Sequence, residues 1–443
     1  MSEQVLEFGE ALAEVLRCAA AVRRCEGNEQ VRLTEAGGRV LAAAVRAERD
    51  QPPFARSTRD GWAVRSADVA AGRALRVTGS VRAGEEWRGP AMGEGEAIEL
   101  MTGAPVPEGA DAVLMVEHAA VNEGGLLRVG EGRVLGAGEN VVPQGAEARA
   151  GAVVAPAGRR VGAAEIAMAA SCGCARLEVF ARPKVAIVAT GDELVEVEEP
   201  ADPTPRDTAA MNGLPGMVDG AKIYNSNSYA LAALVEEEGG EARRLPIARD
   251  VMSDLRERIA AGRETDLLLL SGGVSMGKYD LVEQALHEAG AEFLFTGAWI
   301  QPGKPVVFGR MPRAASQRAS ESARQESARQ EWMYFFGLPG NPVSTEVCFR
   351  LFVAPMLRAV SGRTEVAPQF VEARLAEDVK GGVRVTRFLP AVVSGDWKGV
   401  SVRVVPWQGS GDLAANAQAN GFVVLPGGAE RFAAGESVRV LLR

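Results

Sequence analysis

The spacing of hydrophobic positions divides the chain into stretches of different period. Residues 6–24 carry apolar side chains at helical spacing. From about residue 30 to 180, short apolar runs alternate with glycine, proline and charged turns, which is typical of β-strands, although 161–172 fits a short helix. The β pattern returns after Gly362 and continues to the end of the sequence. We therefore expect β-rich structure on both sides of a central segment.

The central segment, which begins at Pro183, alternates between strand and helix patterns. A β-branched strand is expected at Lys184–Thr190, and four consecutive leucines at 267–270 predict a strand buried on both faces. The other elements expected here are helices over 228–238, 252–261, 281–289 and 343–357, and strands near 305–308 and at 333–336. Such alternation predicts a doubly wound α/β domain with a mainly parallel sheet and helices on both faces.

Two polar segments interrupt the α/β pattern. Residues 199–219 are rich in turn residues, and residues 312–331 contain the near-repeat ESARQ-ESARQ. Both are poor in hydrophobic side chains, which predicts solvated loops. We interpret them as insertions on the α/β domain.

Composition narrows the class of protein. The chain has 443 residues, enough for several domains, and its net charge of −9 argues against nonspecific nucleic-acid binding. The five cysteines do not have the spacing of a zinc site. The sequence has only two histidines, which argues against a metal site built on several histidines. The acidic N-terminus does not resemble a signal peptide, and no apolar run reaches membrane-spanning length. We expect a cytoplasmic protein that does not bind membranes and keeps its thiols reduced.

Polar turns follow several strands of the predicted α/β domain. In a doubly wound sheet, the carboxyl ends of the strands converge on one crevice, where ligands bind. Turns rich in Gly, Ser, Thr and Asn there suggest a long anionic ligand, although each turn alone also fits ordinary loop chemistry. The candidate residues are Thr190, Gly191, Asp192, Glu193, Ser271, Gly272, Gly273, Gly303, Lys304, Pro305, Pro339, Gly340, Asn341, Pro342 and Ser344.

Four carboxylates are expected near the same edge of the sheet: Asp192, Glu193, Asp250 and Asp280. Clustered carboxylates repel one another unless a cation binds them, and their hard oxygen ligands suit Mg²⁺. Solvated surface acids or helix caps remain an equally good interpretation of each one.

The β-rich part contains two rigid loops, at 52–64 and 101–111. The first includes Arg56 and Arg59, which are able to meet an oxyanion, but surface arginines in a turn are the simpler interpretation. The sequence contains no Walker-type phosphate loop, and no G-x-G-x-x-G follows a strand. Both nucleotide-binding classes are therefore disfavoured.

Seven ordered blocks together resemble one family, molybdopterin molybdenumtransferase, and are similar to the C-terminal domain of gephyrin. The blocks are PPFARSTRDGWAVR (52–65), MTGAPVPEGADAVLMVE (101–117), ATGDELVE (189–196), IYNSNSYAL (223–231), SGGVSMGKYD (271–280), QPGKPVVFG (301–309) and GLPGNPVS (337–344). They span nearly the whole chain.

The resemblance implies a multidomain protein with α/β and β parts, and an elongated homodimer whose active sites are built across two chains. The implied units are an N-terminal helix (1–24) on the α/β domain, a β-rich linking domain (25–49 and 146–182), a β-rich domain that contributes to the partner's active site (50–145), a molybdopterin-binding α/β domain (183–360) and a C-terminal β-barrel-like domain (361–443).

The implied reaction joins adenylyl-molybdopterin and molybdate, with Mg²⁺ or a similar cation, to give molybdenum cofactor and AMP. By resemblance, Glu193, Asp250 and Asp280 hold the cation or orient water, while Asp60 and Thr102 reach the site from the partner subunit. The strand-end turns would cradle the pterin and phosphates, and Lys304 would neutralise phosphate or molybdate. Recipient molybdoenzymes and the adenylyltransferase of the same pathway are the implied partners.

The chain departs from the family pattern at two places. It is more basic over Arg56–Arg59, and Gln301 stands where relatives often carry a basic residue, so Arg56 or Arg59 is a candidate substitute. There are two rival functions: a non-catalytic molybdopterin-binding or scaffolding protein of the same fold, and the adenylyl-transfer step, which resides on a related α/β domain alone and is disfavoured by the β-rich flanks.

Overall fold

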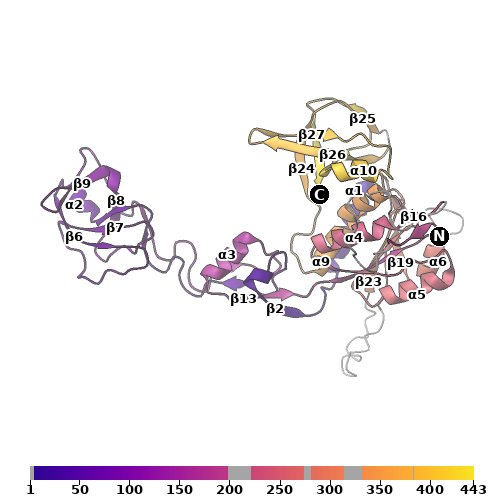
Figure 1. Cartoon of the computed structure of the whole chain (residues 1–443), viewed down its shortest axis with the longest axis horizontal. Coiled ribbons are helices and arrows are strands. Elements are labelled where there is room, and N and C mark those ends of the chain that lie inside the picture. The colour runs from indigo at the N-terminus through magenta and orange to yellow at the C-terminus, as the bar shows by residue number, and fades with distance from the viewer. Residues whose placement is uncertain (1–3, 198–220, 274–280, 314–331, 383) are drawn as a thin grey trace, which may run out of the picture.

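The molecule is elongated and consists of two unequal lobes joined by a small linking unit (Figure 1). A computed structural model describes residues 4–197, 221–273, 281–313, 332–382 and 384–443. It contains β-rich N-terminal parts, an α/β unit and a closed C-terminal barrel, which confirms the predicted fold class. No helix in these ranges is long and apolar enough to span a membrane.

The distal lobe is built on a six-stranded sheet. Its strands, in spatial order, are β8 (Ala112–Met115), β5 (Gly61–Val64), β7 (Glu96–Leu100), β6 (Leu75–Val81), β10 (Leu126–Val129) and β9 (Ala119–Val121). Helix α2 (Ser66–Ala70) follows β5, and β4 (Arg56–Ser57) pairs with β11 (Val141–Val142) beside the sheet. All four residues of β5 are buried, because each face of the sheet carries its own apolar cluster.

The linking unit is formed by two passes of the chain. Strand β2 (Asn28–Arg32) pairs with β13 (Arg176–Phe180), and β3 (Val45–Arg46) pairs with β12 (Val153–Ala155). Helix α3 (Ala163–Ser171) lies where the sequence predicts a short helix. Since the two passes flank the distal lobe in sequence, that lobe is attached to the rest of the molecule through two strands of chain (Figure 1).

The α/β unit has a six-stranded central sheet. Its spatial order is β17 (Glu241–Arg244), β14 (Lys184–Ala189), β18 (Leu267–Ser271), β23 (Trp332–Leu338), β22 (Val307–Pro312) and β19 (Glu292–Phe295). The first four strands are parallel, β22 runs antiparallel to its neighbour β23, and β19 runs antiparallel to β22, in the direction of the first four. The four leucines of β18 are fully buried, as their continuous apolar run predicts.

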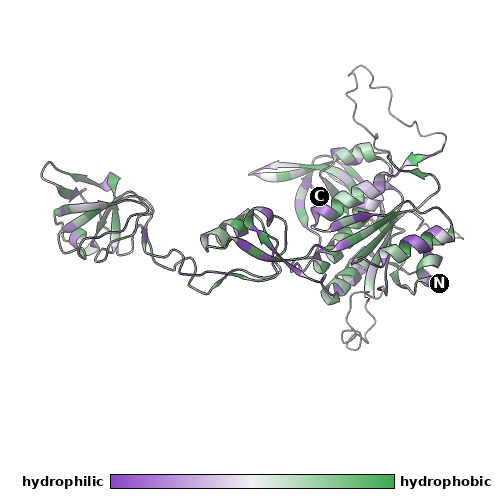
Figure 2. Cartoon of the chain, turned by 60° about the horizontal axis from the view of Figure 1, so that its bottom comes forward, coloured by the Kyte–Doolittle hydropathy of each residue, from purple (hydrophilic) through white to green (hydrophobic). Residues whose placement is uncertain are grey.

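Helices cover both faces of this sheet. One face carries α1 (Phe8–Ala21), α4 (Ser226–Glu237), α8 (Pro342–Cys348), a π-helical segment (Phe349–Val353) and α9 (Ala354–Val360). The other carries α5 (Met252–Gly262) and α6 (Leu281–Glu288). Hydrophobic residues concentrate in the sheet between them (Figure 2).

The C-terminal unit is a closed barrel. Strands β26 (Thr386–Asp396), β27 (Gly399–Val404), β24 (Phe370–Leu375), β30 (Ser437–Leu442) and β28 (Gly421–Leu425) follow one another, and β28 pairs again with β26. The unit also holds α10 (Leu413–Gln418) and the pair β25 (Val379–Gly382) and β29 (Ala429–Phe432). Strand β21 (Ile300–Gln301), from the α/β unit, joins the barrel edge by pairing with β26.

Two further pairs of short strands are present: β1 (Val5–Leu6) pairs with β20 (Gly297–Ala298), and β15 (Leu194–Val195) pairs with β16 (Ile223–Tyr224). Most predicted elements differ from the structure by a few residues at their ends, and two cases stand out. The strand expected near 305–308 begins at Val307, and the helix expected over 343–357 is three consecutive helical segments that end at Val360. The segment 199–219 lies outside the described residues, as does 312–331 beyond Arg313.

Candidate functional site

Three strand-end turns of the α/β unit lie side by side. The amide of Thr190, after β14, donates to the carbonyl of Ser271 at 2.9 Å, and the amide of Gly272 donates to the carbonyl of Leu338, the last residue of β23, at 3.1 Å. The turns therefore follow adjacent parallel strands at one sheet edge, the position at which doubly wound sheets bind ligands.

Steric demand accounts for the glycines of the second turn. Gly272 and Gly273 have φ of +92° and +65°, and a Cβ at Gly272 would lie 2.6 Å from the carbonyl oxygen of Thr190. A side chain is excluded there whether or not a ligand binds. The glycines alone therefore do not decide between a ligand-binding turn and an ordinary one.

Two orphaned polar atoms favour a ligand. Asn227, on α4, uses its amide nitrogen to donate to Ser271 Oγ at 3.0 Å and to the carbonyl of Gly340 at 2.7 Å. Its Oδ1, together with Thr190 Oγ1, is buried without a hydrogen-bond partner among the residues that the structure describes. Buried polar atoms normally find partners, so these atoms indicate a polar group that is bound in function.

Asn227 was not among the residues singled out from sequence. It lies inside the family-like block at 223–231, but nothing in its spacing marks it as a residue that joins two distant turns.

The acidic residues gather beside the first turn. The amide of Asp250 donates to Asp192 Oδ1 at 3.3 Å. Burial, followed by the negative charges of Asp192 and Glu193, raises the pKa of Asp250. Lys222 and Arg249 each donate to the backbone carbonyl of Asp192 and place positive charge nearby.

Asp280, the fourth predicted acid, lies outside the described residues. Within the described ranges, no group of three or more His, Cys, Asp and Glu side chains is arranged to hold a metal ion. The predicted set of Glu193, Asp250 and Asp280 therefore stays a prediction.

A cavity of about 560 Å³ opens between the α/β unit and the barrel. It is lined by Ile300, Gln301, Pro302, Gly303, Lys304, Pro305, Pro339, Asn341, Ser344, Arg387, Trp407, Gln408, Gly409 and Ser410. The side-chain amide nitrogen Nδ2 of Asn341 donates to Ser410 Oγ at 2.8 Å, so the loop after β23 forms one wall and is fixed to the barrel. The other wall contains Lys304, whose ammonium lies 4.4 Å from the ring centre of Trp299.

Among the residues that the structure describes, the cavity lining includes Lys304 and Arg387 but no acidic side chain. Arg387 is held by the carbonyls of Lys380 and Gly381, at 2.7 and 3.1 Å, and its Nε has no partner among the described atoms. Burial lowers the pKa of Arg387. Arg387 on β26 is paired in register with Gln301 on β21. It therefore supplies a positive charge beside Gln301, the position where relatives often carry a basic residue.

Arg387, Trp407, Gln408 and Ser410 escaped sequence reasoning, because they come from the barrel and no motif connects them with the α/β turns. The suggested substitute Arg56 lies in the distal lobe of the same chain, where it pairs with Glu147 at 2.9 Å.

Asp60 and Thr102 also lie in the distal lobe. Asp60 Oδ1 accepts hydrogen bonds from the amide and the hydroxyl of Thr102, at 2.6 and 2.8 Å. These two bonds lower the pKa of Asp60, so its carboxylate is ionised at neutral pH. The pair is one preformed unit, but a single chain does not bring it to the strand-end turns (Figure 1).

Comparisons with known proteins cover almost the whole chain. Family models match in three consecutive parts: the MoeA N-terminal region (domain I and II) over residues 6–173, a probable molybdopterin binding domain over 186–359, and the MoeA C-terminal region (domain IV) over 372–442.

Relatives and solved structures agree with the family models. A molybdopterin molybdenumtransferase of Nostoc sp. is 32% identical over 94% of this chain and 89% of the relative. One of Staphylococcus aureus strain Mu50 is 31% identical over 93% of this chain and 90% of the relative. The crystal structure of the molybdopterin biosynthesis moeA protein from Pyrococcus horikoshii OT3 gives a TM-score of 0.75 at 29% identity, covering 99% of this chain and 100% of that one.

Proposed function

Because the chain belongs to the molybdopterin molybdenumtransferase family, we propose that it inserts molybdenum from molybdate into adenylyl-molybdopterin and releases AMP. One structural observation supports this proposal above others. The loop at 339–344 has one side against the strand-end turns, through Asn227, and the other side in the cationic cavity. A single extended site therefore offers places for a pterin phosphate and for an oxyanion.

The strand-end turns hold the phosphorylated substrate in this proposal. Thr190 Oγ1 and Asn227 Oδ1 are the polar atoms left over for it, and Ser271 is fixed in place by Asn227. Preorganised groups of this kind position a substrate without reordering when it binds.

The cationic cavity holds molybdate. Lys304 and Arg387 supply two positive charges against the two negative charges of the oxyanion, and Gln301, Gln408 and Ser410 offer polar atoms to its oxygens. Hydrogen bonds between a guanidinium and an oxyanion are among the stronger ones in proteins. No carboxylate stands among the described lining residues, which supports the assignment of this cavity to an anion.

Two bond changes complete the reaction. When the two dithiolene sulfurs ligate molybdate, one oxo oxygen leaves as water with the two thiol protons. Hydrolysis of the pyrophosphate adds water across its P–O–P bridge and separates AMP from the pterin phosphate. The chain's own contribution is to hold both substrates side by side and to stabilise the charge that develops on the phosphate.

The proposal assigns the acidic residues to a divalent cation. Desolvation and the negative charges of Asp192 and Glu193 raise the pKa of Asp250, and a bound cation would relieve the repulsion. Glu193, Asp250 and Asp280 would hold Mg²⁺, which neutralises phosphate charge during hydrolysis.

The proposal includes a homodimer. Asp60 and Thr102 are exposed at the far lobe and already hydrogen-bonded to each other, as expected of a unit that completes the active site of a partner subunit. All five cysteines are free, which is consistent with the reducing cytoplasm. Recipient molybdoenzymes and the adenylyltransferase of the pathway are the proposed partners.

AMP release tests the proposal. Purified protein supplied with adenylyl-molybdopterin, molybdate and Mg²⁺ should release AMP, and Asp280→Ala should lose turnover more than pterin affinity. Tight pterin binding without AMP release would favour the non-catalytic scaffold, which the transferase relatives disfavour. Consumption of ATP with unmodified molybdopterin would point to the adenylyl-transfer step.

A further inference from the structure

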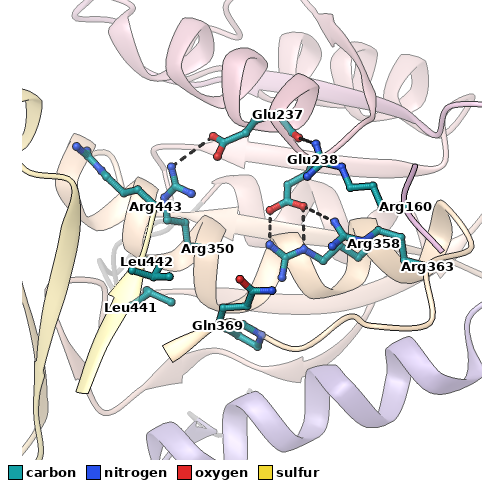
Figure 3. A pocket seen from close by; sticks show the side chains of 11 residues that line it. Arg160, Glu237, Glu238, Arg350, Arg358, Arg363, Gln369, Leu441, Leu442 and Arg443 are labelled. Carbon is teal, nitrogen blue, oxygen red and sulfur yellow. Dashed lines mark hydrogen bonds and ion pairs between the residues drawn. The ribbon is translucent and has the colours of Figure 1, made fainter. Parts of the chain in front are cut away.

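A second charged cavity, of about 160 Å³, lies where the linking unit, the α/β unit and the barrel meet (Figure 3). It shares no lining residue with the cavity proposed for molybdate. Its walls are formed by Arg160, Glu237, Glu238, Arg350, Arg358, Arg363, Pro368, Gln369, Leu441, Leu442 and Arg443.

Ion pairs fix most of these walls. Glu238, at the end of α4, accepts from Arg358 and from Arg363, the latter at 3.1 Å (Figure 3). Arg350 meets Glu237 at 3.4 Å. Behind the wall, Glu346 pairs with Arg350 at 2.9 Å and with Arg443 at 2.5 Å.

The side-chain charges do not cancel. Among the described side chains, five arginines line the cavity, whereas Glu237, Glu238 and Glu346 supply three carboxylates, which leaves an excess of two positive side-chain charges. The exposed Glu365 acts on Arg363 only at longer range. A half-enclosed site with excess positive charge attracts anions.

The unused donors belong to Arg363 and Arg160. One terminal nitrogen of Arg363 donates to Glu238. The Nε and the second terminal nitrogen of Arg363 make no hydrogen bonds to described residues. Arg160 donates to the backbone carbonyl of Glu237 at 3.1 Å and makes no ion pair with any described carboxylate. Burial and the positive charges of Arg358 and Arg160 lower the pKa of Arg363.

We propose that this cavity binds one small divalent oxyanion, held mainly by Arg363 and Arg160. The planar guanidinium fork matches two oxygens of a tetrahedral anion, and the volume admits such an anion but not a nucleotide. Phosphate, sulfate and molybdate share this chemistry. Because the cavity joins three units of the fold, a bound anion would also stabilise their junction.

Calorimetric titration of the full-length protein with inorganic phosphate, sulfate and molybdate tests the site. The Lys304→Ala, Arg387→Ala background removes the other oxyanion cavity, so binding that remains belongs to the junction. Arg160→Gln and Arg363→Gln should each weaken it on the order of tenfold, as loss of a charge-assisted hydrogen bond predicts. Arg159→Gln is the matched control, because Arg159 pairs with Glu165 at 2.7 Å instead of lining the cavity, and it should bind as the parent does.

Each outcome decides. Equal affinity for phosphate and sulfate identifies a general oxyanion site, and binding of molybdate alone identifies a second molybdate site. No binding of any of the three at millimolar concentration, or unchanged binding in Arg160→Gln, overturns the proposal. Arg160 is exposed, so its variant should remain folded, which thermal unfolding checks. A partner carboxylate seated in the cavity in a crystal of the dimer also overturns it.

Discussion

Arg387 offers the most specific prediction, because it places a positive charge in the proposed molybdate cavity, which the neutral Gln301 beside it cannot do. Its guanidinium is held by the carbonyls of Lys380 and Gly381, and its side chain lines the cationic cavity. Arg387→Ala removes one of the two positive charges that we assign to molybdate binding.

The expected loss follows from a charge-assisted hydrogen bond. Such a bond contributes about 1.5–3 kcal/mol, which corresponds to roughly 10- to 150-fold in affinity. The KM for molybdate should rise by that factor, whereas the KM for adenylyl-molybdopterin should change little. Loss of the two bonds to β25 should also cost about 1–3 kcal/mol of stability.

Steady-state AMP release at varied molybdate concentration measures the effect. Arg387→Lys should be intermediate, because it keeps the charge but loses the guanidinium fork. Arg374→Ala is the matched control: Arg374 also donates to a barrel carbonyl, that of Gly435 at 3.0 Å, but lies outside the cavity. An Arg387→Ala enzyme with wild-type KM for molybdate would refute the assignment.

Three further predictions concern the strand-end turns and the acids. Gly272→Ala should destabilise the protein by about 1–3 kcal/mol in chemical unfolding, because its φ is +92° and its Cβ would lie 2.6 Å from the carbonyl of Thr190; unchanged stability would contradict this. Asn227→Ala should lower AMP release, and Asn227→Asp should do the same, because the hydrogen bonds to Ser271 and Gly340 need an amide donor. Burial and neighbouring charge raise the pKa of Asp250 above its unfolded value, so stability should fall as pH rises through the window between the two. Asp250→Asn should therefore be more stable than wild type at neutral pH, and this gain in stability should shrink in acid. The variant should be inactive with Mg²⁺. A variant that is less stable than wild type at neutral pH would show that the carboxylate is not under repulsion.

Hydrophobic pattern predicted the parts of the fold that depend on local sequence. The leucines at 267–270 became the buried central strand β18, and the glycine turn after them does lie at the sheet edge beside Thr190. Continuous apolar runs and Gly-rich turns are decided by neighbours in sequence, so they can be read directly.

Contacts between distant segments could not be read in this way. Gln301 was recognised as a departure from the family, but its neighbour Arg387 is found only through the pairing of β21 with β26. Asn227 joins Ser271 to Gly340 from the start of a helix, and its own segment carries no sign of either partner. Register and cross-domain pairing are properties of the folded chain, which one sequence without structure leaves open.

Coupling between molybdate and AMP release tests the central claim most directly. In single-turnover experiments, the purified protein is mixed with adenylyl-molybdopterin and Mg²⁺, and both AMP and pterin-bound molybdenum are measured with and without molybdate. The proposed reaction predicts one AMP for each molybdenum inserted, and AMP release that accelerates when molybdate is added. Insertion of molybdenum without release of AMP would contradict the proposed reaction. AMP release that proceeds without insertion, and at the same rate with and without molybdate, would also contradict it.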